Sequence, residues 1–284
     1  MTDAPSYFRG RKLVIATMHG KEQVLAPILE KALGVEVVLA PQLNTDAFGM
    51  FTGEIPRVLS PEDAAIEKCM TAMAITQCDL AVANEGSFGP HPLIGFVASD
   101  EEWIVLIDRK NHFRISAREI STDTNFDAQL CFTIDELLSF ADKVSFPSHA
   151  LILQPAQEDF RKIVKGIADL QQLQNEGHAF LSAYGSVYAS TDMRAMFNPA
   201  RMKVIAAAAE KLIEKINTRC DGCAKPGFEV KEVIPGLPCS ACGSATRSTM
   251  AWVYVCNHCG FRKQTNFPHA KTTEDPMYCD LCNP

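Results

Sequence analysis

The sequence predicts an α/β domain with a largely parallel sheet covered by helices, followed by a small zinc-ribbon-like module with two four-cysteine zinc sites. Two observations support this prediction. Strand-like apolar runs alternate with helix-like segments over residues 1–217, which is typical of a parallel sheet with helices on both faces. Eight of the eleven cysteines form four CxxC pairs within residues 218–284, so we expect the domain boundary near Asn217.

Five short apolar runs have the length and composition of buried strands. The third, DLAVA, gives way at Asn84 to the polar run NEGSFGPHP, which we expect to form a loop stiffened by its prolines. The predicted strands cover residues 12–16, 35–41, 80–83, 103–108 and 149–155.

Helix-start signals accompany the helical periodicity between these runs. Ser60 is an N-cap followed by proline, Thr133 and Glu136 form a capping box, and Asn198 caps the last helix, which reaches the first cysteine pair. The predicted helices lie before Gly34, after Ser60, over residues 134–143, over residues 157–174 and after Asn198.

The composition is ordinary for a globular protein, with 47% hydrophobic and 21% charged residues in a chain of 284. No apolar run reaches the roughly 18 residues of a membrane span, and the first residues lack the pattern of a signal peptide. The net charge of −7 does not favour binding to nucleic acid or to an anionic membrane. We therefore expect a cytoplasmic protein without membrane association.

Polar residues follow three of the predicted strands at what would be one edge of the sheet. In open α/β sheets ligands bind beyond the carboxyl ends of the strands, so these residues predict a pocket for a small polar or anionic ligand. They are His19, Lys21, Asp46, Glu54, Arg57, Asn84, Glu85, Ser87 and His91.

Glu85 or His19 is the expected acid/base group of this pocket, with His91 and Asp46 as supporting groups or ligands. Prolines and glycines around Glu85 would hold it in place before a ligand arrives. Each residue also has a structural alternative, because histidines and carboxylates next to glycine often only cap or fill turns.

Basic residues could bind an anionic group of the ligand. Lys21 stands at a predicted helix start, where phosphates and carboxylates bind, and Arg194 and Arg201 lie near another one. The alternative is that these side chains are simply solvated.

Several common catalytic motifs are absent from the sequence. It contains no GxGxxG after a strand, no GxxxxGK[ST], no GxSxG and no HExxH, which disfavours routine nucleotide binding, serine hydrolysis and zincin chemistry. Histidines and carboxylates of the pocket could instead hold an additional divalent ion with a position open for water.

The CxxC spacing suits two thiolates that reach one tetrahedral zinc ion from a tight turn. Disulfides are disfavoured in a reducing cytoplasm, and iron–sulfur clusters fit this spacing poorly. Closed four-cysteine sites are structural, so we expect two structural zinc ions.

A strand predicted over residues 250–255 separates the second and third cysteine pairs, as in the hairpin of a zinc ribbon. We therefore expect nested pairing, with sequential or crossed pairing as alternatives. Nested pairing places Cys239, Cys242, Cys256 and Cys259 on one ion and Cys220, Cys223, Cys279 and Cys282 on the other.

The charge of the cysteine-rich module makes nucleic acid an unfavourable partner. It carries six Lys or Arg and six Asp or Glu from Cys220 onward, and eight thiolates with two Zn²⁺ add a net negative charge. Trp252 and Tyr254 could stack on bases, but such residues more often form the core of a ribbon.

Four segments together resemble one uncharacterised bacterial family with a domain of unknown function. They are ATMHGKE, ANEGSFGPHP, TDMRAMFNPARM and the closing run GLPCSACG…CNHCG…DPMYCDLCNP, so the resemblance covers nearly the whole chain. It implies an N-terminal α/β domain joined to a cysteine-rich tail, and it implies no particular chemistry.

Two hypotheses for function follow from the sequence. In the first, the protein is an enzyme that acts on a small polar or anionic metabolite in the pocket, with or without metal assistance. In the second, it is a non-enzymatic, zinc-stabilised protein that binds a protein or nucleic-acid partner. The sequence assigns neither a substrate nor an oligomeric state.

Overall fold

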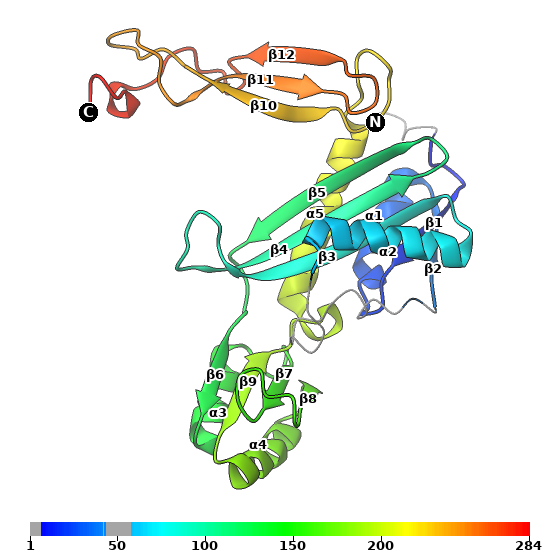
Figure 1. The fold of residues 1–284 in the computed structure, drawn as a ribbon, viewed down its shortest axis with the longest axis vertical. Helices are drawn as coiled ribbons and strands as arrows, with labels where there is room; N and C mark the ends of the chain where they lie inside the picture. The colour runs from blue at the N-terminus through cyan, green and yellow to red at the C-terminus, as the bar shows by residue number, and fades with distance from the viewer. Residues whose placement is uncertain (1–6, 42, 44–57) are drawn as a thin grey trace. The chain divides into compact units, whose positions relative to one another are not determined.

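A computed structural model describes residues 7–41, 43 and 58–284 of the chain (Figure 1). The chain divides into two compact units, unit 1 (Met1–Ile213) and unit 2 (Glu214–Pro284). The described residues form a five-stranded and a four-stranded sheet in unit 1 and a three-stranded sheet in unit 2. Among the described helices, none is both long enough and apolar enough to cross a membrane.

The five-stranded sheet of unit 1 is mixed, with the strand order β2-β1-β3-β4-β5. β1 (Lys12–Ala16), β2 (Glu36–Leu39) and β3 (Leu80–Pro90) are parallel, whereas β4 (Ala98–Asp108) and β5 (Phe113–Ser121) continue the sheet by antiparallel pairing. The prediction of a largely parallel sheet is therefore wrong. The short turns that join β3, β4 and β5 allow only antiparallel neighbours.

β3 is longer than the sequence predicted. The polar run that begins at Asn84 is not a loop but the second half of this strand, because β4 pairs with β3 all the way to Pro90. β1 pairs with β3 only as far as Ala83. The polar half of β3 therefore extends beyond the carboxyl end of β1, next to the turn that leads into the first helix.

Three helices accompany this sheet: α1 (Glu22–Leu33), α2 (Pro61–Thr76) and α5 (Pro199–Asn217). α2 lies over one face of the sheet and α5 over the opposite face (Figure 1). The predicted Ser60 cap is confirmed, since its hydroxyl accepts a hydrogen bond from the amide of Asp63 (3.1 Å). Mostly small side chains of α2 and of the sheet form the core between them, among them Val14, Ala16, Ala65, Cys69, Ala72, Met73, Ala81, Ala83 and Val105.

The four-stranded sheet of unit 1 is antiparallel, with the order β6-β9-β7-β8. Its strands are β6 (Ala128–Cys131), β7 (Leu151–Gln154), β8 (Val164–Ile167) and β9 (Val187–Thr191). The core under one face holds Leu151 and Leu153 of β7 and Val187 and Ala189 of β9. Ile152 and Gln154 consequently face the other side of the sheet.

Helices α3 (Ile134–Lys143) and α4 (Leu170–Tyr184) pack against this core. The predicted capping box of α3 is confirmed: the Thr133 hydroxyl accepts from the Glu136 amide (3.2 Å), and the Glu136 carboxylate accepts from the Phe132 amide (2.7 Å).

The helix predicted over residues 157–174 is wrong in its position. Residues 164–167 pair with β7 as strand β8, and α4 starts only after Asp169, whose carboxylate accepts from the Gln172 amide (2.9 Å). Gly166 has a φ of 74°, which interrupts helical geometry.

Unit 2 is built on the antiparallel sheet β10-β11-β12. Its strands are β10 (Glu229–Pro235), β11 (Thr249–Val255) and β12 (Arg262–Asn266). A small core joins Phe228 and Tyr254 to the first and third cysteine pairs. The Phe228 ring lies 5.5 Å from that of Tyr254 and 6.0 Å from that of Phe261.

Candidate ligand pocket and metal centres

A cavity of about 410 Å³ lies within unit 1. Its walls come from the end of β1, the polar half of β3 and the four-stranded sheet. That sheet contributes the face opposite its hydrophobic core, with Ile152 and Gln154 of β7 and Tyr188 and Ser190 of β9. The size matches that of typical small-molecule sites. Side chains of both sheets thus share one cavity.

The alternation of a strand explains how β3 distributes its polar side chains. Successive residues point to opposite faces, so Asn84 and Gly86 face α5 while Glu85 and Ser87 face α2. One short polar sequence therefore supplies groups to both layers around the sheet.

Glu85 pairs with Lys68 of α2. Both side chains are buried, at 7% and 8% exposure. Lys68 occupies the apolar stripe of α2 between Ala65 and Ala72, and this position requires a buried partner because a lone buried ammonium is costly. Both residues line the cavity.

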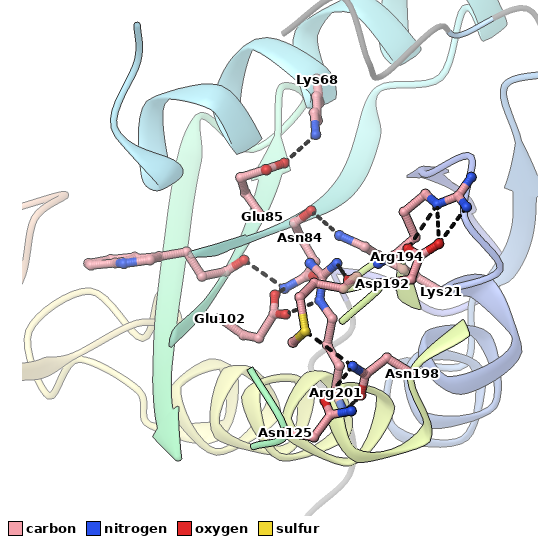
Figure 2. A network of polar contacts seen from close by, with 12 residues as sticks. Lys21, Lys68, Asn84, Glu85, Glu102, Asn125, Asp192, Arg194, Asn198 and Arg201 are labelled. Carbon is pink, nitrogen blue, oxygen red and sulfur yellow. Dashed lines mark hydrogen bonds and ion pairs between the residues drawn. The ribbon is translucent and has the colours of Figure 1, made fainter. Parts of the chain in front are cut away.

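Arg201 of α5 forms the second buried ion pair, with Glu102 of β4 (Figure 2). Its Nε donates to the Glu102 carboxylate at 2.6 Å, and its Nη1 donates to the carbonyl of Met193. Asn84 donates through Nδ2 to the other Glu102 oxygen at 2.9 Å and to the carbonyl of Trp103. Strands β3 and β4 and helix α5 are thereby connected through one carboxylate.

Gly86 is required for this ion pair. A Cβ atom at this position would lie 2.5 Å from Arg201 Nη2 and 2.6 Å from Glu102 Oε1. Any larger residue would displace the guanidinium or the carboxylate. The glycine therefore serves close packing.

Arg194 and the start of α5 form the neighbouring wall. The Arg194 guanidinium binds the buried Asp192 carboxylate through two nitrogens and lies over the Phe197 ring, 4.6 Å from its centre. The predicted cap of α5 is confirmed, because Asn198 Oδ1 accepts from the Arg201 amide at 2.9 Å. Its Nδ2 donates to Asn125 Oδ1 (Figure 2).

Lys21 occupies the N-cap position of α1, directly after Gly20, which turns the chain with a φ of 76°. The side chain is buried, and Nζ donates to the carbonyl of Asn84 at 2.9 Å. Burial, with a further contribution from the Arg201 charge, lowers the pKa of Lys21 to about 7. Near neutral pH this amine therefore exists in both its charged and its neutral form.

Three buried polar atoms of the cavity wall have no hydrogen-bond partner among the described residues: Thr17 Oγ1, Asn84 Oδ1 and Gln154 Nε2. Buried polar groups are normally hydrogen-bonded, because an unpaired one is costly. Such atoms around one cavity indicate that a ligand or water completes their bonding.

A buried acid lies next to the Arg201–Glu102 ion pair. Asp100 of β4 is 1% exposed, and its carboxyl group interacts directly with that of Glu102. Burial and the adjacent Glu102 charge raise the pKa of Asp100 to about 8. The acid form of Asp100 is consequently favoured near neutral pH.

The structure brings together most of the residues predicted for the pocket. The lining includes His19, Lys21, Asn84, Glu85, Ser87, Arg194 and Arg201. His91 lies apart from this lining, in the turn after β3, where Nδ1 accepts from the amides of Leu93 and Ile94 (both 3.2 Å). Asp46, Glu54 and Arg57 lie outside the described residues.

Sequence reasoning missed Lys68, Glu102, Asp192 and Gln154. The sequence does contain a signal for Lys68, which lies three residues after Ala65 and four before Ala72, on the apolar face of its helix. A lysine on such a face needs a buried partner. Glu102 and Gln154 had no such signal, since their roles depend on which strands become neighbours.

Unit 2 gathers its eight paired cysteines into two groups of four. One comprises Cys220, Cys223, Cys256 and Cys259, and the other Cys239, Cys242, Cys279 and Cys282. Neighbouring sulfurs lie 3.6 to 3.9 Å apart, too far for disulfides and close to the ~3.8 Å edge of a tetrahedron with metal–sulfur bonds of about 2.3 Å. Each group can therefore hold a metal ion.

The expected nested pairing is wrong, and the observed pairing is crossed. Antiparallel pairing places Glu229 opposite Val255, so the cysteine pair before β10 meets the pair after β11. At the other end of the hairpin, the backbone of Glu274 hydrogen-bonds to the backbone on both sides of Cys239. This bridge places the fourth cysteine pair next to the second pair. The strand register thus determines the ligand sets.

In the described residues, groups of three or more metal-ligating side chains occur only at these two cysteine centres. No such group lies in the described part of the unit 1 cavity lining.

These features define a two-unit protein: an α/β unit with a cavity into which several charged and polar side chains project, and a β unit with two four-cysteine centres. The chain belongs to the family described as a domain of unknown function, DUF6671, whose model matches residues 68–284. No curated protein matches the chain.

Solved structures give distant matches. One is the crystal structure of protein VC0702 from Vibrio cholerae, with 11% identity and a TM-score of 0.31 over 72% of this chain and 94% of that one. A likeness at this level supports no conclusion about fold or function.

Proposed function

We propose that unit 1 binds a small polar or anionic metabolite in its cavity and acts on it as an enzyme, with Lys21 as the reactive group. The observation that supports this most directly is a buried amine on the cavity wall whose pKa is lowered to about 7. Such shifts are frequent at catalytic sites, because a group that titrates near the working pH exchanges protons efficiently.

The surroundings of Lys21 support this role. Two neighbouring basic side chains, Lys68 and Arg201, are each paired with a carboxylate, Glu85 and Glu102, and these ion pairs hold them in place beside Lys21. The lining carries acidic as well as basic side chains, so it offers both donors and acceptors to a small polar or anionic ligand. In this proposal Glu85 anchors Lys68, and the acid/base role passes from Glu85 or His19 to Lys21.

The experiment is a screen of small carboxylated and phosphorylated metabolites by thermal shift, followed by turnover assays of every compound that raises the melting temperature. We expect Lys21→Met to retain the fold and lose turnover. Lys31→Met, an exposed position on the same helix, is the matched control and should behave as wild type. Unchanged turnover by Lys21→Met would refute the assignment.

We also propose that the two cysteine centres hold structural zinc. Four thiolates at tetrahedral spacing are a closed ligand set, which stabilises a small module that has only a small apolar core. Thiolate ligands remain available in a reducing compartment, in agreement with the expected cytoplasmic location. Elemental analysis of the full chain should give two zinc ions per chain, whereas iron would identify a different centre.

A second candidate function is partner binding by unit 2. Three apolar side chains lie just before or within the fourth cysteine pair. They are Met277, Tyr278 and Leu281, and they are 60%, 59% and 74% exposed. The first two belong to the short helix η3 (Pro276–Tyr278). Exposed apolar side chains close together favour a protein contact. Replacing all three by serine would abolish partner capture under this hypothesis and leave turnover in unit 1 unchanged.

A further inference from the structure

We propose that Lys21 forms an imine with the carbonyl group of a small oxo acid bound in the cavity. This inference rests on the proposed function and names the chemistry of the same amine.

Ion pairing around Lys21 leaves the amine available. Glu85 pairs with Lys68 and Glu102 pairs with Arg201, and no carboxylate in the described part of the chain forms an ion pair with Lys21. Its hydrogen bond goes to a neutral acceptor, the Asn84 carbonyl. That acceptor binds an N–H and leaves the lone pair of the neutral amine free to attack.

Burial on the cavity wall favours the neutral amine that such an attack requires. The Arg201 charge acts in the same direction, and together they outweigh the Glu102 and Glu85 carboxylates, which favour the charged form. An exposed lysine with an ordinary pKa has fewer than about one neutral amine in a thousand at pH 7. Lys21 therefore has a large advantage as a nucleophile at neutral pH.

The imine step is balanced without a metal or a redox partner. The Lys21 nitrogen forms a bond to the carbonyl carbon, and the carbonyl oxygen accepts the two amine protons and leaves as water. The product is a carbon–nitrogen double bond at Nζ. Polar groups that have no described partner, such as Gln154 Nε2, lie on the cavity wall to receive the oxygen atoms of the ligand.

The type of carbonyl compound is inferred from the hydrogen-bond donors on the cavity wall. The lining holds ammonium and guanidinium groups, on Lys68, Arg194 and Arg201, that can donate to a carboxylate beside the carbonyl group of the ligand, and it also holds the carboxylates Glu85 and Asp192 that position them. A cavity of about 410 Å³ accommodates a small metabolite of this kind. The ligand class is thus a small 2-oxo acid or a related aldehyde acid.

The test uses glyoxylate as the probe on the full-length protein at pH 7, with cyanoborohydride to reduce any imine to a stable carboxymethyl amine. Peptide mapping by mass spectrometry then locates the modification. We expect Lys21 to be modified at least about tenfold faster than the exposed Lys31 of the same helix, because of its larger neutral fraction. The preference should vanish when the protein is first unfolded in urea.

The result that would overturn the imine is modification of exposed lysines with Lys21 left intact. This readout comes from the wild-type chain, so it does not depend on how well a variant folds. Lys21→Met should remove the fast-reacting site, whereas Lys31→Met should leave it unchanged.

The imine and the proposed function can fail separately. If Lys21 remains unmodified but Lys21→Met still abolishes turnover of a screened metabolite, the imine is refuted and the proposed function stands. If Lys21 is modified and Lys21→Met turns over every screened metabolite as wild type does, the amine is reactive but the proposed function is refuted.

Discussion

Lys21 illustrates how one residue can link stability to pH. Its pKa is about 7 in the folded chain and near 10.5 when solvated, so between these values the unfolded chain binds the extra proton. The contribution of Lys21 to stability therefore increases as the pH rises from about 7 to about 10.5, and below pH 7 the full cost of its buried charge remains.

This pH dependence is testable by chemical denaturation of wild type and Lys21→Met from pH 6 to pH 10. Methionine does not titrate, so we expect the difference in unfolding free energy between the two proteins to shift in favour of wild type as the pH rises. A difference independent of pH would show that Lys21 titrates normally in the folded state.

Asp100 should produce the opposite trend. Its folded pKa of about 8 lies above the value of 3.8 for a solvated Asp, so the folded chain binds the extra proton between these values. Asp100 therefore lowers stability as the pH rises from about 4 to 8.

Asp100→Asn replaces this carboxyl by a neutral group of similar shape. We expect thermal unfolding to show the variant gaining stability relative to wild type between pH 5 and pH 8. Asp123→Asn, at an exposed position after β5, is the control and should follow wild type. Equal pH profiles for wild type and Asp100→Asn would contradict the raised pKa.

At the scale of an element, β3 depends on close packing at a single glycine. Gly86→Ala would place a methyl group against the Arg201–Glu102 ion pair, and we expect it to lower the unfolding free energy by about 1–3 kcal/mol. Gly89→Ala, on the same strand, is the matched control, since a Cβ there has no described atom within 4 Å. Urea denaturation of both variants measures the difference, and similar losses in the two would refute the packing argument.

β3 also shows why sequence reasoning about elements succeeded only in part. Caps are local, so the starts of α2, α3 and α5 were predicted from Ser60, Thr133 and Asn198. The length of a strand is not local, because Asn84 to Pro90 are held in strand geometry by hydrogen bonds to β4. The polar residues read as a loop until that partner is known.

The candidate site shows the same division. Residues that follow the predicted strands, such as Lys21 and Glu85, could be identified from their position in the chain, although Glu85 lies within β3 itself. The low pKa of Lys21 could not, because it depends on burial and on Arg201, which is distant in sequence. His91 was selected for its chemistry, but its ring accepts hydrogen bonds within its own turn.

For the whole molecule, crossed pairing predicts how metal content responds to substitutions in different cysteine pairs. Cys220→Ser with Cys256→Ser damages one centre, so the purified full chain should retain one metal ion. Cys220→Ser with Cys282→Ser damages both centres and should leave none. Elemental analysis distinguishes the arrangements, because nested pairing predicts the reverse.

Crossed pairing also sets an order of events during synthesis. The ribosome releases the cysteines in chain order, and the four thiolates of the first centre have all emerged once Cys259 has left the exit tunnel. Cys239 and Cys242 by then lie in the loop that this centre closes, and their centre is complete only after Cys279 and Cys282, which come later in the sequence, have also emerged. A chain truncated between Cys259 and Cys279 would contain one complete centre, and the thiols of Cys239 and Cys242 would have no partner cysteines for a metal ion and would be open to oxidation.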